Sequence, residues 1–264
     1  MSGDSARGLP WDPVVPAASF AALLRSQHLE PRWSLPAEAA GLEAPEGTTV
    51  LAFRYADGVL MAGDRRATAG NVIAHRSLQK VFPADGWSAV AISGTAGVAL
   101  ELIRLFQTEL EHYEKLEGSR LSLEGKANHL AAMVRAHLPM AFQGLAVVPL
   151  FCGFDVASGR GRLYSFDVVG GRYEETDFAA TGSGGQYAKS HLRNSFRDGL
   201  SEDEALRIAV EALVAAAEED AATGGPDLQR GIYPNVVVIS PQGYREMAQE
   251  RVAAAARRAM GEAR

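Results

Sequence analysis

The sequence predicts an α+β protein, a four-layer αββα sandwich in which two antiparallel sheets stack face to face and a pair of helices covers each outer side. Two observations lead to this prediction. The apolar segments follow the order strands, two helices, strands, two helices, strand. Several of the short strand segments are apolar on both faces, which is typical of strands that are covered on both sides.

The first strands follow a leader that lacks a sustained hydrophobic period. Residues 1–47 are rich in proline, alanine and glutamate and predict little regular structure apart from a short helix over Ala17–Gln27. Val50–Tyr55 and Val59–Gly63 are apolar runs separated by Ala56-Asp57-Gly58, and Asp-Gly between two such runs predicts a β-hairpin. The next two strands are expected at Lys80–Pro83 and Trp87–Ser93.

The hydrophobic period then changes to that of α-helices. The first helix has apolar residues three or four positions apart on one face, at Ala99, Leu102, Ile103, Phe106, Leu110 and Tyr113. The same spacing predicts a second helix over about Ser122–Leu138. We expect these two helices to cover one outer side of the sandwich.

Strands and a second pair of helices follow. The strands are predicted at Val147–Val156, Arg162–Val169 and Tyr173–Ala179. Gly170-Gly171 turns the last two of these into a hairpin. One helix is predicted over Gly185–Phe196, and another begins at Ser201, where Glu204 three residues later forms a capping-box pattern.

The predicted fold ends with a last strand at Asn235–Ser240. The tail from about Arg245 is rich in alanine, arginine and glutamate and predicts a peripheral helix. We therefore expect one folded domain over residues 48–264 behind the leader of residues 1–47.

The composition excludes several classes of function. A net charge of −6 offers no basic face for nucleic acid, and no apolar stretch approaches the roughly 20 residues of a membrane span. The one cysteine, Cys152, lies in an apolar run and predicts a small buried hydrophobe in a reducing, cytoplasmic compartment. Ala37-Glu38-Ala39 looks like a signal-peptidase site, but the acidic residues and prolines before it argue against secretion. No metal-binding or nucleotide-binding motif is present, so we expect no cofactor.

The junction between Gly47 and Thr48 carries the first chemical signal. A threonine hydroxyl is a poor nucleophile until a base removes its proton, and the free α-amine of the same residue, with a pKa of about 8, can be that base. Inside a chain that nitrogen is an amide and has no basicity. A nucleophilic Thr48 therefore requires cleavage after Gly47, which makes residues 1–47 a propeptide. Taken alone, Gly-Thr-Thr before a strand is more often simply β-branched strand sequence.

Three residues near predicted strand ends could support such a nucleophile. Asp64 follows the second strand and Lys80 opens the third, and a pair of the two beside Thr48 would lower the pKa of its hydroxyl and keep the α-amine unprotonated. The backbone N–H of Gly94, in a turn of small residues, is a candidate donor to an oxyanion. Each also has an ordinary interpretation: a solvated ion pair, a surface lysine and a plain turn.

Six segments in a fixed order carry a family resemblance. They are Gly47-Thr48-Thr49, Gly63-Asp64-Arg65-Arg66-Ala67-Thr68, Lys80, Ser93-Gly94-Thr95-Ala96-Gly97, Gly182-Ser183-Gly184 and Asp220-Ala221-Ala222-Thr223-Gly224-Gly225. Asp64, Lys80 and Gly94 follow Thr48 by 16, 32 and 46 positions. With this order and spacing, residues 48–240 resemble a β subunit of the proteasome, within the N-terminal-nucleophile hydrolases. The whole chain most resembles the actinobacterial type, which has a long propeptide.

The resemblance implies a threonine-type endopeptidase that also cleaves its own chain after Gly47. The implied catalytic residues are Thr48, Asp64, Lys80, Gly94, Ser183, Asp220 and Thr223. Thr48 would be the nucleophile. Ser183 and Asp220 would form hydrogen bonds around the new N-terminus, together with Thr223, which stands where the family more often has serine. The Gly47–Thr48 bond would be the site of propeptide removal.

The resemblance also implies a substrate pocket for the side chain before the cleaved bond. The residues expected to line it are Ala67, Thr68, Ile92 and Ala96. Judged by residue type alone, Ala67, Ile92 and Ala96 are equally well interpreted as core. An uncharged apolar pocket favours apolar or aromatic side chains over acidic ones.

The implied partners are other subunits of a large particle. The family forms heptameric β rings, capped by α rings, with the nucleophiles facing an enclosed chamber. Substrates arrive through an ATPase and carry a small ubiquitin-like protein tag. Apolar residues left exposed on the helix face Glu101–Glu117 would lie at ring contacts.

Three alternative interpretations each fit part of the sequence. Ser77-Leu78-Gln79-Lys80 matches the Ser-x-x-Lys pattern of penicillin-binding serine hydrolases, but the companion Ser-Asp-Asn and Lys-Thr-Gly elements are absent. A catalytically silent ring subunit would keep the fold and act only as a scaffold, although such subunits typically lose the threonine or the lysine. The two-ring bacterial threonine peptidase that works with a dedicated unfoldase also begins with Thr-Thr, but it lacks a long leader and its second motif differs.

Overall fold

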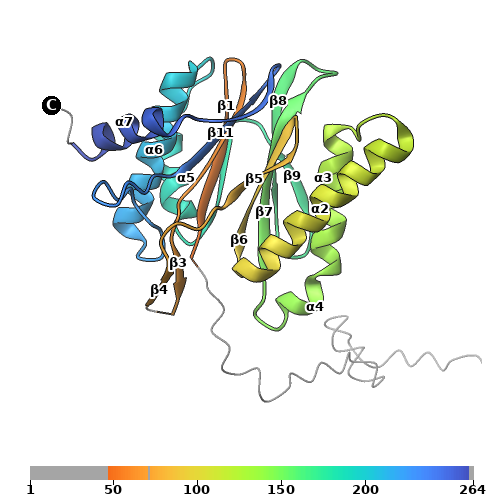
Figure 1. Cartoon of the computed structure of the whole chain (residues 1–264), viewed down its shortest axis with the longest axis horizontal. Coiled ribbons are helices and arrows are strands. Elements are labelled where there is room, and N and C mark those ends of the chain that lie inside the picture. Colours follow the sequence, from red (N-terminus) through yellow and green to blue (C-terminus); the bar gives the residue numbers. More distant parts are fainter. Residues whose placement is uncertain (1–46, 71, 262–264) are drawn as a thin grey trace, which may run out of the picture. The chain divides into compact units, whose positions relative to one another are not determined.

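Two five-stranded antiparallel sheets form the centre of the computed structural model, which describes residues 47–70 and 72–261 (Figure 1). The first sheet contains β1 (Thr49–Tyr55), β2 (Gly58–Gly63), β10 (Phe178–Gly182), β11 (Asn235–Ser240) and β12 (Gly243–Glu246), in the order β10-β1-β2-β11-β12. The second contains β5 (Val81–Asp85), β6 (Ser88–Gly94), β7 (Val147–Asp155), β8 (Arg160–Phe166) and β9 (Arg172–Glu175), in that order. A separate hairpin pairs β3 (Ala67–Ala69) with β4 (Val72–His75).

Helices cover both outer sides of the paired sheets. On one side lie α2 (Ala96–Glu117) and α3 (Leu123–Ala136), followed by the short α4 (Leu138–Ala141). On the other lie α5 (Gly185–Ser195), α6 (Glu202–Glu219) and α7 (Gln249–Ala259) (Figure 1). The predicted αββα sandwich is therefore confirmed. Within the described residues, none of these helices is both long and apolar enough to cross a membrane.

Three apolar layers fill the sandwich, and strand alternation assigns residues to them. In β1, Leu51 and Phe53 pack against the helices α5 and α6, whereas Val50 and Ala52 face the second sheet. The middle layer also contains Cys152, which is fully buried, as predicted. Because both faces of the central strands are covered, their sequences are apolar throughout instead of alternating with polar residues.

Three features of the fold differ from the prediction. The strand expected over Tyr173–Ala179 is two strands in different sheets, because β9 pairs with β8 whereas β10 pairs with β1. The fold does not end at Ser240, since β12 returns along β11 and α7 then packs its buried Val252 and Ala256 against α6. The β3–β4 hairpin was not predicted because its strands are short and β4 is largely exposed. The leader helix expected over Ala17–Gln27 lies outside the described residues.

The register of the first sheet gathers the predicted site at one end. Thr49, at the start of β1, pairs with Gly182 at the end of β10, and Val50 pairs with Gly63 at the end of β2. Gly63 in turn pairs with Asn235 at the start of β11. The residues that follow Gly63 and Gly182, namely Asp64 and Ser183, therefore emerge beside Thr48.

Candidate active site

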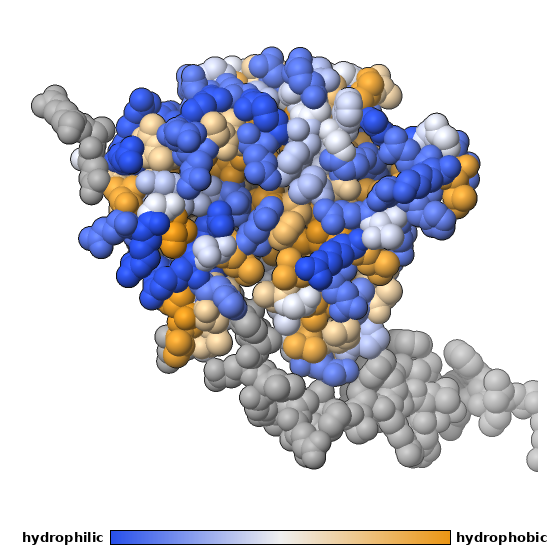
Figure 2. All heavy atoms as spheres, in the orientation of Figure 1, coloured by the Kyte–Doolittle hydropathy of each residue, from blue (hydrophilic) through white to orange (hydrophobic). Residues whose placement is uncertain are grey.

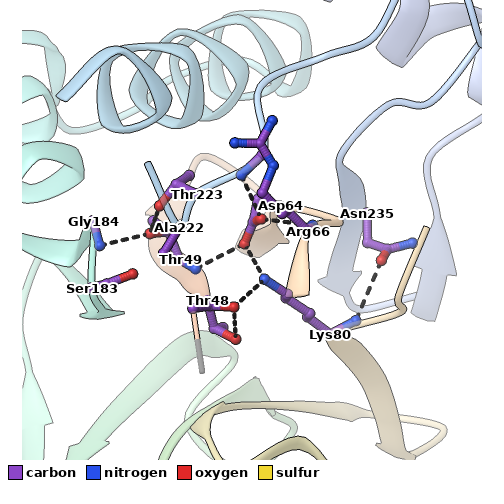
Figure 3. Close-up of polar contacts among 12 residues, drawn as sticks. Thr48, Thr49, Asp64, Arg66, Lys80, Ser183, Gly184, Ala222, Thr223 and Asn235 are labelled. Atoms are coloured by element: carbon purple, nitrogen blue, oxygen red, sulfur yellow. Dashed lines mark hydrogen bonds and ion pairs between the residues drawn. The ribbon is translucent and has the colours of Figure 1, made fainter. Parts of the chain in front are cut away.

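The carbonyl group of Gly47 is the centre of the site. Thr48 lies just before β1 and is 6% exposed. Its Oγ1 donates a hydrogen bond to the Gly47 oxygen at 2.8 Å, and the Nζ of Lys80 donates to the same oxygen at 3.0 Å (Figure 3). The bond between Gly47 and Thr48 thus has a hydroxyl beside its carbonyl group and a cation that polarises it.

Lys80 and Asp64 form the predicted ion pair. Nζ of Lys80 lies 2.5 Å from Oδ1 of Asp64, and the two side chains are 2% and 0% exposed. Three main-chain N–H groups also donate to the Asp64 carboxylate, from Thr49 at 2.8 Å, Arg66 at 2.9 Å and Gly224 at 2.8 Å. A buried carboxylate needs such partners to remain charged.

The same burial acts on the lysine. Desolvation lowers the pKa of Lys80 below its usual value, and the attraction of Asp64 only partly opposes this effect. The bonds to Asp64 and to the Gly47 oxygen hold the Lys80 side chain in a fixed position within the site.

A second carboxylate, Asp220, lies at the end of α6, and its charge acts on Lys80. Its Oδ2 accepts hydrogen bonds from the hydroxyl of Ser183 at 2.6 Å and from that of Thr223 at 2.5 Å. Burial raises the pKa of Asp220, but these two hydrogen bonds and one from the Ala222 N–H lower it by more, so the net shift is downward. The N–H of Ser183 donates to the carbonyl oxygen of Thr48 at 3.0 Å, which brings this group to the same main chain.

Gly94, the predicted oxyanion donor, ends β6 in a conformation that requires glycine. Its φ is +108°, and a Cβ atom there would lie 2.1 Å from the carbonyl oxygen of Ala146. A Cβ placed on Gly182 would lie 1.7 Å from the oxygen of Thr48 and 3.4 Å from the Cβ of Ser93. The main chain at Gly182 therefore lies close to Thr48 on one side and to Ser93, at the end of β6 beside Gly94, on the other.

The four residues predicted to line the substrate pocket are only partly accessible in this chain. Ala67, Thr68 and Ile92 are buried, and Ala96 lies half-buried at the start of α2. Thr68 is next to the Gly47–Thr48 bond, since its Oγ1 lies 2.6 Å from where a Cβ on Gly47 would be. The role of the four as a pocket stays a prediction.

No metal site accompanies this arrangement in the part of the chain that the structure describes: no group of three or more His, Cys, Asp or Glu side chains there is placed to hold an ion. The polar groups of the site instead satisfy one another through hydrogen bonds and the Asp64–Lys80 ion pair.

Comparison with known proteins identifies the family. A family model described as a proteasome subunit matches residues 44–227. This chain belongs to the proteasome subunit family. It is 54% identical over 243 residues to the proteasome subunit beta of Acidothermus cellulolyticus, covering 90% of this chain and 84% of that protein. It is 54% identical over 224 residues to that of Streptomyces griseus (85% and 80%) and 52% identical over 255 residues to that of Acidimicrobium ferrooxidans (96% and 93%).

Membership of the proteasome family agrees with the geometry around Lys80 and removes one alternative. In a Ser-x-x-Lys hydrolase the lysine serves the serine, but here the Nζ of Lys80 binds Asp64 and the Gly47 oxygen. Ser77 is exposed, and its carbonyl oxygen accepts a hydrogen bond from Arg65.

Several contributors to this proteasome-family site were not predicted. They include the N–H groups of Arg66 and Gly224 and the hydroxyl of Thr49. These residues all lie within segments that carry the resemblance, but their residue types do not predict the hydrogen bonds that they form. Asn235, whose Oδ1 accepts from the Lys80 N–H at 3.4 Å, lies at the start of the predicted last strand.

Proposed function

We propose that this chain is the catalytic β subunit of a proteasome core particle, a threonine endopeptidase that exposes its own nucleophile by cleaving after Gly47. One observation carries the proposal: the Gly47 carbonyl oxygen accepts hydrogen bonds from both the Thr48 hydroxyl and Lys80. Three relatives named proteasome subunit beta support it.

Self-cleavage follows as an acyl transfer from nitrogen to oxygen. The Oγ of Thr48 attacks the Gly47 carbonyl carbon, and Lys80 stabilises the negative charge that develops on the oxygen. The C–N bond breaks, the hydroxyl proton ends on the departing nitrogen, and an ester joins Gly47 to the threonine oxygen. Water then hydrolyses the ester, which releases residues 1–47 and leaves Thr48 with a free α-amine.

Substrate hydrolysis reuses these groups on another peptide. The α-amine of Thr48 takes the hydroxyl proton, and the oxygen attacks a substrate carbonyl carbon whose oxyanion binds the N–H of Gly94. The leaving amine takes the proton, and water activated by the α-amine hydrolyses the resulting ester. Asp64 and Lys80 supply the supporting charges, and Ser183, Asp220 and Thr223 orient the new N-terminus. The pocket at Ala67, Thr68, Ile92 and Ala96 would favour apolar side chains.

We infer the assembly from the family. Heptameric β rings stacked on one another and capped by α rings would enclose the nucleophiles in a cytoplasmic particle, and an ATPase would deliver unfolded proteins that carry a ubiquitin-like tag. Apolar side chains exposed on α2 support such contacts, among them Leu105 and Leu116. Figure 2 shows apolar residues interspersed among hydrophilic ones on the visible face of the domain.

The test is the intact mass of the chain purified with its α partner, beside a Thr48→Ala variant. We expect a wild-type species that begins at Thr48, and only the full-length precursor from Thr48→Ala, because the variant lacks the attacking hydroxyl. A full-length wild-type chain in an assembled particle would contradict the proposal and support a catalytically silent scaffold instead.

A further inference from the structure

Thr49, the residue after the proposed nucleophile, forms hydrogen bonds with two separate parts of the site. It is fully buried at the start of β1. Its N–H donates to Oδ1 of Asp64 at 2.8 Å. Its hydroxyl oxygen accepts from the N–H of Gly184 at 3.0 Å and lies 2.6 Å from the hydroxyl oxygen of Thr223 (Figure 3).

The direction of these hydrogen bonds follows from counting protons. An ionised carboxylate only accepts, so the single hydroxyl proton of Thr223 goes to Asp220, 2.5 Å away. Thr223 must then accept at the 2.6 Å contact, and Thr49 must donate. The bonds therefore run in one direction, from the Gly184 N–H through Thr49 and Thr223 to Asp220.

The surroundings leave the two hydroxyls little freedom. A Cβ atom on Gly184 would lie 2.5 Å from the hydroxyl oxygens of both Thr49 and Thr223, so only glycine fits there. Thr223 is also fully buried. β-Branching restricts the χ1 angle of Thr49, and β10 and β2 pair with β1 on either side of it.

We propose that Thr49 is a positioning residue for the proteolytic site. Its hydrogen bonds connect the Asp64–Lys80 pair to the Ser183–Asp220–Thr223 group. The inference rests on the proposed function. Thr49 acts only through other groups: its N–H fixes one carboxylate, its hydroxyl fixes the other through Thr223, and the main chain of Thr48 is held between them. Loss of its hydroxyl would leave the Gly184 N–H without an acceptor and Thr223 without a donor.

The experiment compares Thr49→Val, which keeps the shape but loses the hydroxyl, with Thr49→Ser, which keeps the hydroxyl. Thr181→Val is the matched control, because Thr181 lies on the adjacent strand β10 and its hydroxyl bonds Ser93 instead. Each chain is assembled with its α partner. Precursor processing is followed by intact mass, and kcat and KM are measured with a fluorogenic peptide.

We expect Thr49→Val to lower kcat and the processing rate by about ten- to a hundredfold, with KM changed little, because one buried hydrogen-bond chain is broken. Thr49→Ser should restore both rates, and Thr181→Val should match the wild type.

Equal kcat and processing rate in Thr49→Val and Thr181→Val would overturn the inference while leaving the proposed function intact. A wild-type chain that is neither processed nor active would instead contradict the proposed function. If Thr49→Val does not assemble, Thr49→Ala serves as the second variant. It removes the same hydroxyl from a smaller side chain, and the same loss of kcat with unchanged KM is expected.

Discussion

Gly47 is the residue at which conformation and chemistry depend on each other most closely. Its φ of +115° disfavours any side chain, and a Cβ atom would lie 2.6 Å from Oγ1 of Thr68 and 2.8 Å from Cβ of Ala222. We expect Gly47→Ala to slow the proposed cleavage after residue 47 strongly, because the carbonyl group would move away from Thr48 and Lys80. Precursor and mature masses followed over time measure this.

Gly118→Ala is the control for Gly47→Ala, because it introduces backbone strain without a steric clash. Gly118 has a φ of +65° but meets no atom within 4 Å. Its substitution should cost about 1 kcal/mol of stability while processing proceeds at the wild-type rate. Normal processing in Gly47→Ala would show that the proposed cleavage does not need the tight fit around the bond between residues 47 and 48.

The buried ion pair yields a second prediction for a single residue. Lys80→Met leaves the charge of Asp64 buried without its cation, so we expect a loss of about 3–5 kcal/mol in the free energy of unfolding, together with loss of processing. Lys115→Met is the control, because Lys115 and Glu111 form an exposed pair on α2 whose loss should change stability by less than about 0.5 kcal/mol. Chemical denaturation measures both variants, and equal stability losses would refute the assignment.

At the scale of elements, helix starts differ in how they are stabilised. Ser201 caps α6 with a complete capping box, in which its hydroxyl accepts from the Glu204 N–H and the Glu204 side chain accepts from the Ser201 N–H. Thr95 precedes α2 without a side-chain capping bond, and its buried hydroxyl has no hydrogen-bond partner within the described residues. Ser201→Ala should therefore cost about 1 kcal/mol, whereas Thr95→Ala should cost close to nothing. Chemical denaturation of the two variants measures these losses of stability, and equal losses would contradict the prediction.

Local sequence signals predicted the elements that depend on near neighbours. The Asp57-Gly58 hairpin, the capping box at Ser201 and the apolar face of α2 agree with the structure. The strand expected over Tyr173–Ala179 was wrong because its division depends on partners far along the chain: Phe178 pairs with Phe53, whereas Tyr173 pairs with Ser165. The sequence of these seven residues alone does not indicate which strand each half pairs with.

The residues of the candidate site could also be predicted only in part from the sequence. The Asp64–Lys80 pair could be predicted because both side chains are charged and lie near strand ends. The three main-chain donors to Asp64 and the bonds of Thr49 could not, because every residue except proline carries an N–H group and only the folded backbone directs it.

For the whole molecule, the outer face of α2 is a candidate contact between subunits. Leu105 and Leu116 are 45% and 72% exposed there. Leu116→Glu should weaken assembly, because a charge would have to be buried at a ring contact, while the fold stays intact. Val156→Glu, at an equally exposed turn after β7, is the control and should assemble normally. Native mass spectrometry of the particles measures the difference, and equal assembly of both variants would contradict the contact.

The middle layer of the sandwich also determines how the protein can be labelled. Cys152 is the one cysteine of the chain, it is fully buried between the sheets, and burial raises the pKa of its thiol. Maleimides and other alkylating reagents need an accessible thiolate, so they should leave the native domain unmodified. A cysteine introduced at any exposed position would then carry a fluorophore or spin label alone. Slow alkylation of Cys152 itself would report how often the two sheets separate.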